Sequence, residues 1–219
     1  MQTQTMLLDT LDLDLTQKLS SRRALFGLSA TKLGVLATAP LILAAVSTAA
    51  FGQEMPKQVV DVLNFALTLE YLEDEFYRTA LAAPGLIPAE FAVVFAQISK
   101  HETAHVATLK GALGAAAVAK PEFDLTARGK YHDVLTNFKT FAAVSQALED
   151  TGVAAYKGQA GALAGAGKVL TIALQIHSVE ARHAAEVRRV RGVKAWTGAF
   201  DKPLTKAQVL AIAKPFIVG

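Results

Sequence analysis

The sequence contains no cysteine, and this absence excludes disulfide frameworks, thiolate zinc sites and thiol nucleophiles together. The net charge is also small. The 219 residues include 22 Lys and Arg and 19 Asp and Glu, which gives a formal net charge of +3. So small an excess does not make the basic surface that nucleic-acid binding requires, and we expect no nucleic-acid partner. Any chemistry must therefore use carboxylates, histidine, tyrosine or the backbone.

The apolar residues, 52% of the chain, are unevenly distributed. A run of 21 positions, Leu33–Gln53, has no charged residue and is long enough to span a bilayer. The pair Arg22–Arg23 precedes this run, and small residues around Ala49 follow its apolar centre. Because this order is typical of a secretory signal, residues 1–52 are predicted to be a signal peptide, or an N-terminal anchor if no cleavage occurs.

The arginine pair resembles the twin-arginine export signal, whose pathway carries proteins that are already folded. The resemblance implies an exported protein in the periplasm or cell envelope, which contacts a membrane only through residues 1–52 if these stay attached. Residues 53–219 have the length of one ordinary domain.

Four segments of this domain are rich in Ala and Leu and lie between breaks formed by Pro and Gly, which predicts four long helices. We expect these helices at about 56–82, from Pro88 onward, at 136–157 and at 168–191. A long connection, at about 114–137, separates the second helix from the third. Thr205 predicts an N-capped short helix over 206–213, which we expect Trp196 and Phe200 to fasten to the bundle.

In each long segment a carboxylate stands where the helical period demands an apolar residue. These residues are Glu70, Glu102, Glu149 and Glu180. Four buried carboxylates in one core would repel one another and lose hydration, so they need cationic partners. Two divalent metal ions would supply four positive charges, and two neutral imidazoles would complete the ligand set. Charge balance therefore favours a two-metal site.

The spacing of histidines supports this interpretation. His105 follows Glu102 by three residues, and His183 follows Glu180 by three, so each pair lies on neighbouring turns of one helix face. The second pair lies 78 residues after the first. Two such pairs at matched positions indicate more than chance, since a single one is weak evidence.

The other two carboxylates repeat in the same way. Tyr77 follows Glu70 by seven residues, and Tyr156 follows Glu149 by seven. The chain is therefore an internal repeat of two helical hairpins. One Glu from each of two helices, with one Glu-x-x-His from each of the others, is the ligand pattern of ferritin-like di-iron and di-manganese bundles.

At these positions the chain resembles the ferritin-like superfamily and, within it, exported ferritin-like proteins of the desiccation-related type. The resemblance rests on Leu67–Tyr77, His101–His105 and the tail Gly198–Ile217. It implies an all-α, ferritin-like four-helix bundle with a long connection between helices 2 and 3 and a short C-terminal helix. It also implies a metal site that uses Glu70, Glu102, His105, Glu149, Glu180 and His183.

Some assignments stay open at this point. Glu73 or Asp74 would replace Glu70 as the ligand if the first helix were rotated. Tyr77 and Tyr156 are either core aromatics or hydrogen-bond donors to the ligands. His101 and His177 lie beside the ligand stripe, and we expect both to stay outside the ligand set. Gly152, inside the third helix, leaves room either for a substrate or for close helix packing.

The ligand set favours iron, then manganese, with zinc or copper left open. Shared ligands at Glu102 and Glu180 would leave open positions on both ions, so we expect redox chemistry on ferrous iron, oxygen, peroxide or superoxide. The expected role is protection against oxidative stress or desiccation. The alternative is a structural envelope or stress protein without turnover. Iron storage, a homo-oligomer and a cell-envelope partner are left open.

Overall fold

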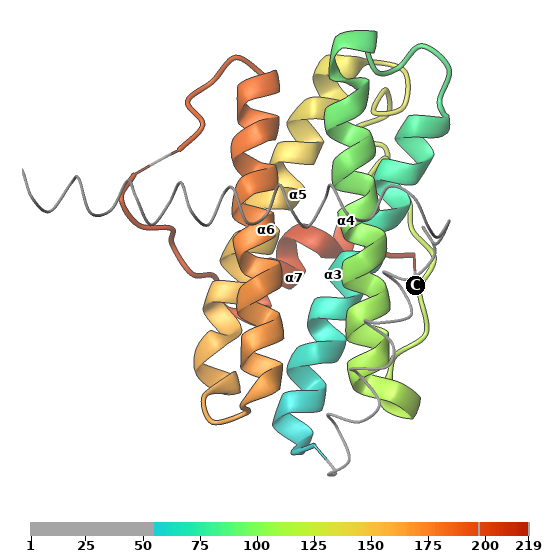
Figure 1. Cartoon of the computed structure of the whole chain (residues 1–219). Coiled ribbons are helices and arrows are strands. Elements are labelled where there is room, and N and C mark those ends of the chain that lie inside the picture. The colour runs from blue at the N-terminus through green and yellow to red at the C-terminus, as the bar shows by residue number, and fades with distance from the viewer. Residues whose placement is uncertain (1–54, 197, 219) are drawn as a thin grey trace, which may run out of the picture. The chain divides into compact units, whose positions relative to one another are not determined.

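The computed structural model describes residues 55–196 and 198–218, and four long helices lie side by side in it (Figure 1). The helices are α3 (Lys57–Ala82), α4 (Ala89–Leu113), α5 (Phe138–Gln159), α6 (Lys168–Val190) and the short α7 (Lys206–Ala213). This confirms the predicted four-helix bundle and its short C-terminal helix. The signal or anchor predicted for residues 1–52 lies outside the described residues. Within the described part, no helix combines the length and the apolar character needed to cross a membrane.

The bundle consists of two helical hairpins, α3 with α4 and α5 with α6. A short turn joins α3 to α4 and includes Gly85, whose φ of 71° lies in the left-handed region that favours glycine. Asn137 begins the second hairpin, because its side chain accepts a hydrogen bond from the backbone N–H of Lys139. The predicted repeat of two hairpins is thus present as two packed structural units.

Two apolar clusters fill the bundle, one toward each end. The first contains Phe76, Phe95 and Phe141, whose rings pack against one another, with centroid distances of 4.8 Å for Phe95–Phe141 and 5.3 Å for Phe76–Phe141. The second contains Leu63 and Leu109, both at most 1% exposed. The helical turns between these clusters carry the carboxylates that the sequence placed on the apolar stripe. The core therefore holds a polar layer between two apolar layers.

The connection between α4 and α5 is fastened by the C-terminal residues. The backbone N–H of Asp124 donates to the carbonyl of Phe216 at 2.8 Å, and that of Val218 donates to Glu122 at 2.9 Å. Phe216 is buried, and its ring stacks on Tyr131. The long connection is thus an ordered part of the domain.

Helix α7 lies across the bundle near its middle (Figure 1). Thr205 is the N-cap of α7, as predicted, and its side-chain oxygen accepts a hydrogen bond from the backbone N–H of Gln208. Its buried residues Val209 and Ala213 pack with side chains of α3 and α5. A Cβ on Gly158 would lie 1.9 Å from the carbonyl oxygen of Leu204, so glycine is required where the chain approaches α5.

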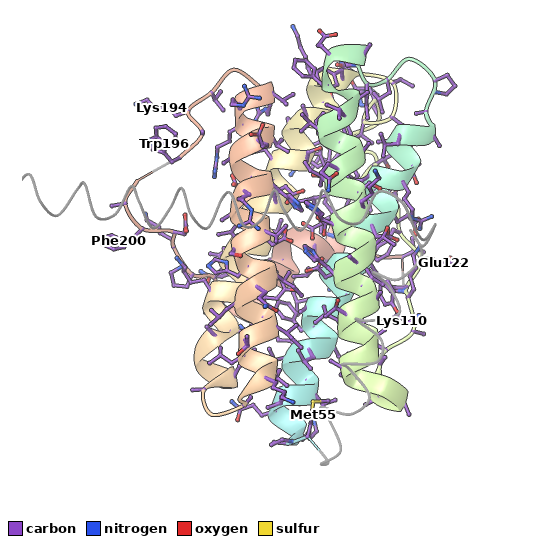
Figure 2. The ribbon with its side chains drawn as sticks, in the orientation of Figure 1. Met55, Lys110, Glu122, Lys194, Trp196 and Phe200 are labelled. Carbon is purple, nitrogen blue, oxygen red and sulfur yellow. The ribbon has the colours of Figure 1, made fainter. Side chains whose placement is uncertain are left out.

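The expectation that Trp196 and Phe200 fasten α7 is wrong. Trp196 is 75% exposed and Phe200 is 90% exposed, and both lie on the segment that leaves the bundle after α6 (Figure 2). The space against α3 and α5 is already filled by Val209 and Ala213, with Leu204 packed beside them. Aliphatic residues, and not Trp196 or Phe200, therefore fasten α7 to the bundle.

Candidate metal centre

Each of the four long helices contributes one carboxylate to the polar layer. Glu70 of α3 is 1% exposed, and Glu102 of α4, Glu149 of α5 and Glu180 of α6 are fully buried. The helices bury these residues because each occupies a stripe position between apolar residues one turn away. Four carboxylates in so dry a layer require compensation by positive charge.

His105 approaches three of these carboxylates with one ring atom. Its Nδ1 lies 3.1 Å from an oxygen of Glu70, of Glu102 and of Glu180. A single N–H cannot donate to three acceptors at once. The four residues form one group whose ligand atoms lie within 4.8 Å of one another.

His183 occupies the corresponding place in a second group. Its Nδ1 lies 2.9 Å from Oε1 of Glu102 and 3.2 Å from Oε2 of Glu149. With Glu180 these residues form a second set of ligand atoms within 4.8 Å of one another. Glu102 and Glu180 belong to both groups. They are the two residues that the sequence suggested as shared ligands.

Several atoms of this layer make no hydrogen bond of regular geometry although water does not reach them, and they meet only the close ion pairs described above. They are Oε1 of Glu102, Oε2 of Glu149, both carboxylate oxygens of Glu180 and Nδ1 of His183. Buried polar atoms without regular hydrogen bonds cost free energy, so such a concentration fits a layer that binds cations. A divalent metal in each group would satisfy these atoms. The donor set therefore fits the two ions that the sequence predicts.

The pKa values of the carboxyl groups reflect the excess of negative charge buried in this layer. Burial raises the pKa of Glu102 to about 7, although His105 and His183 act in the opposite direction. Burial also raises the pKa of Glu180 well above its usual range, and the charge of Glu102 raises it further. For Glu70 the charge of His105 outweighs burial and lowers the pKa. Without metal, part of this layer therefore holds protons that bound cations would replace.

The pKa values of the two imidazoles are also shifted, because carboxylates surround both rings. Burial lowers the pKa of His183, but its close ion pairs with Glu102 and Glu149 outweigh burial and raise that pKa to about 10. The charge of Glu70 likewise overcomes burial and raises the pKa of His105. In the metal-free protein both imidazoles thus serve as the cations, and metal binding would release their protons.

The two tyrosines cross between the halves of the repeat. The hydroxyl of Tyr77 donates to Oε1 of Glu149, and that of Tyr156 donates to Oε1 of Glu70 at 2.5 Å. Both hydroxyls are buried, and burial raises both pKa values well above the usual range of tyrosine. Each tyrosine therefore acts as a neutral donor that orients a carboxylate of the opposite hairpin, which is one of the two roles the sequence left open.

All six residues proposed as ligands from the sequence lie in one layer, and their role as ligands stays a prediction. Of the alternatives to Glu70, Asp74 lies outside both groups, because it accepts hydrogen bonds from Thr103 and Arg78. Glu73 is also outside both groups but is only 3% exposed. Helix α3 thus buries Glu70 and Glu73 together, where the sequence presented them as alternatives.

His101 has a closer relation to the layer than its sequence position suggested. Its Nδ1 lies 2.8 Å from Nε2 of His183, and Gln97 lies 2.7 Å from its Nε2. With Nδ1 of His183 bound to a metal ion, the neutral ring would carry its proton on Nε2 and donate it to Nδ1 of His101. Metal-binding histidines are commonly oriented by such a partner. The counterpart of His101 in the second half of the repeat is Val179, so the support is asymmetric.

The fold and this layer agree with the family to which the sequence is similar. A family model described as "Ferritin-like domain" matches residues 58–193, which include all four long helices, and the chain belongs to that family. No curated protein matches the chain. The family therefore defines the fold and is compatible with a di-metal site, and the particular activity must be argued from the residues.

Proposed function

We propose that this protein binds two transition-metal ions, iron first and manganese next, and carries out redox chemistry on ferrous iron, dioxygen, peroxide or superoxide. One ion would be held by Glu70 and His105 and the other by Glu149 and His183, with Glu102 and Glu180 shared. Oxygen and imidazole donors in this proportion suit iron and manganese better than soft metals. When bound, the ions supply reversible one-electron chemistry that no side chain here provides.

The observation that carries this proposal is the set of buried atoms without regular hydrogen bonds, most of them on the two carboxylates that both ligand groups share. A bundle kept only for stability gains nothing from such atoms, because apolar residues of equal size would cost less. The chain's own residues hold the carboxylates in place, exclude water with an apolar layer on each side, and orient Glu70 and Glu149 through tyrosine hydroxyls.

The test uses the full chain purified from cells grown with iron and manganese. We expect oxidation of ferrous iron, or decomposition of peroxide or superoxide, in the wild type and its loss in Glu102→Ala. Glu90→Ala is the matched control, because Glu90 is an exposed carboxylate on the same helix. A wild type without turnover, or a Glu102→Ala variant that keeps the activity, would contradict the proposal and favour a structural role in the envelope.

Export to the periplasm or cell envelope is part of the proposal and is supported by the sequence of residues 1–52. Export in the folded state would let the metal be selected before the protein leaves the cytoplasm. Replacement of both arginines, Arg22→Lys with Arg23→Lys, is expected to leave the protein in the cytoplasmic fraction. Recovery of that variant in the envelope fraction would contradict export by the twin-arginine route.

A further inference from the structure

A small pocket lies on the α3/α5 side of the bundle, at the inner edge of α7. Its lining is mainly apolar and includes Leu72, Leu148, Ile212 and Ala213, together with Glu73 and Gly152. The pocket has room for about one water-sized molecule. It thus connects the outer helix with two residues that border the carboxylate layer.

Gly152 forms the inner end of this pocket. A Cβ at Gly152 would lie 3.0 Å from Oε2 of Glu180 and 3.6 Å from Oε1 of Glu73. Any other residue would crowd Glu180, because 3.0 Å is closer than an ordinary van der Waals contact. The glycine therefore lets the pocket end directly against a carboxylate that both ligand groups share.

Glu73 is the one carboxylate in the pocket lining. It is 3% exposed, and its Oε1, like Oε2 of Glu180, faces Gly152. A carboxyl group buried this deeply in a mainly apolar lining loses most of its hydration, which is costly. Its position between the pocket and Glu180 favours a role in what enters the pocket.

The outer end of the pocket is formed by α7. Ile212 is 39% exposed and lines the pocket, whereas Val209 of the same helix is fully buried against α3 and α5. The close approach of Leu204 to Gly158 fixes the start of this helix. A change at Ile212 therefore alters the mouth of the pocket without touching a residue of the metal centre.

We propose that a small uncharged oxidant, dioxygen or hydrogen peroxide, reaches the metal centre through this pocket, past Ile212 and then Gly152. This inference rests on the proposed function. The apolar lining favours an uncharged reactant, because a hydrated ferrous ion would lose its water there without replacement ligands. A superoxide anion would lose its hydration there in the same way. The pocket has room for about one water-sized molecule, so it admits only the smallest reactants.

The test measures how fast nitric oxide, an uncharged diatomic ligand of ferrous iron, binds to the full chain loaded anaerobically with ferrous iron. Ile212→Trp narrows the mouth and is expected to slow association about tenfold, and Ile212→Ala is expected to speed it. Ala211→Trp is the matched control, since Ala211 is exposed on the same helix and does not line the pocket. Iron content and nitric oxide bound at saturation are expected to stay unchanged in all three variants.

The same order of rates is expected when dioxygen or hydrogen peroxide oxidises the loaded protein. Equal association rates in Ile212→Trp and wild type, with iron bound in both, would overturn the pocket and leave the proposed function intact. Slower association in Gln97→Trp would overturn the pocket as well, because that substitution adds bulk on the α4/α6 side of the bundle instead. A wild type that binds no iron would overturn the proposed function itself, so the two failures are distinguishable.

Discussion

Tyr156 donates a hydrogen bond of 2.5 Å to Oε1 of Glu70, although 86 positions separate the two residues and they lie in different halves of the repeat. Tyr77 donates to Glu149 in the mirrored arrangement. Each hairpin therefore orients a carboxylate of the other hairpin. The ligand layer can form only when both hairpins are packed together.

Removal of one such hydroxyl is expected to weaken metal binding. In Tyr156→Phe, Glu70 loses its donor while the ring still fills the core, and affinity for one of the two ions should fall about 10- to 100-fold. Metal titration of the metal-free protein measures this change. Tyr71→Phe is the control, because the Tyr71 hydroxyl faces the backbone of Val118. Equal metal affinity in Tyr156→Phe and Tyr71→Phe would show that the hydrogen bond does not orient a ligand.

Substitution of a shared carboxylate should stabilise the metal-free protein while it abolishes the response to metal. Glu180→Gln removes a fully buried acid whose pKa is raised by burial, so unfolding in urea without metal should cost about 1–3 kcal/mol more than for wild type. Added metal should then give no further gain. Glu186→Gln, an exposed change on the same helix, is expected to behave as wild type. A lower free energy of unfolding for metal-free Glu180→Gln than for metal-free wild type would contradict the claim that buried negative charge destabilises the metal-free protein.

The stability of the metal-free protein should fall as pH rises. Burial raises the pKa of Glu102 from 4.5 to about 7, so its contribution is full below pH 4.5 and is lost as pH rises through 7. Close ion pairs with Glu102 and Glu149 outweigh burial and raise the pKa of His183 from 6.5 to about 10, so its contribution is lost as pH rises through 10. Metal ions replace these protons, and the rise in melting temperature on adding metal should therefore grow with pH. A metal-induced shift that is constant or shrinks with pH would contradict this account.

The support given by His101 predicts that the two metal positions differ. His101→Ala removes the acceptor for Nε2–H of His183 and should weaken binding of the ion held by His183, with little effect on the ion held by His105. Binding isotherms should show that the affinity of one site falls while that of the other is kept. His177→Ala is the matched control, since His177 contacts no ligand residue. Two sites weakened equally in His101→Ala would argue against an orienting role.

The helices and the buried carboxylates were predictable from sequence because both obey the helical period. The expected first helix began one residue before Lys57, and the expected third began two residues before Phe138. Glu102 and Glu180 were recognised because a charge interrupts an otherwise apolar stripe and because each precedes a histidine by three residues. Periodicity within one helix identifies the buried face, and the internal repeat shows which faces correspond.

Relations between helices were not predictable in the same way. The pattern placed each tyrosine on the same stripe as a glutamate of its own helix, but the hydrogen bond is made to the other hairpin. His101 occupies no repeated position, so only the rotation of α4 against α6 brings it to His183. Trp196 was expected to fasten α7 to the bundle because it is a large aromatic residue near that helix in the sequence, but the backbone after α6 leaves it exposed.

The most direct test of the central claim is the metal content of the purified full chain by elemental analysis, with Glu102→Ala analysed in parallel. The account predicts about two iron or manganese ions per chain in the wild type, because two ligand groups share Glu102 and Glu180, and loss of both ions in the variant. A wild type that contains no stoichiometric transition metal after growth in metal-replete medium would contradict the account.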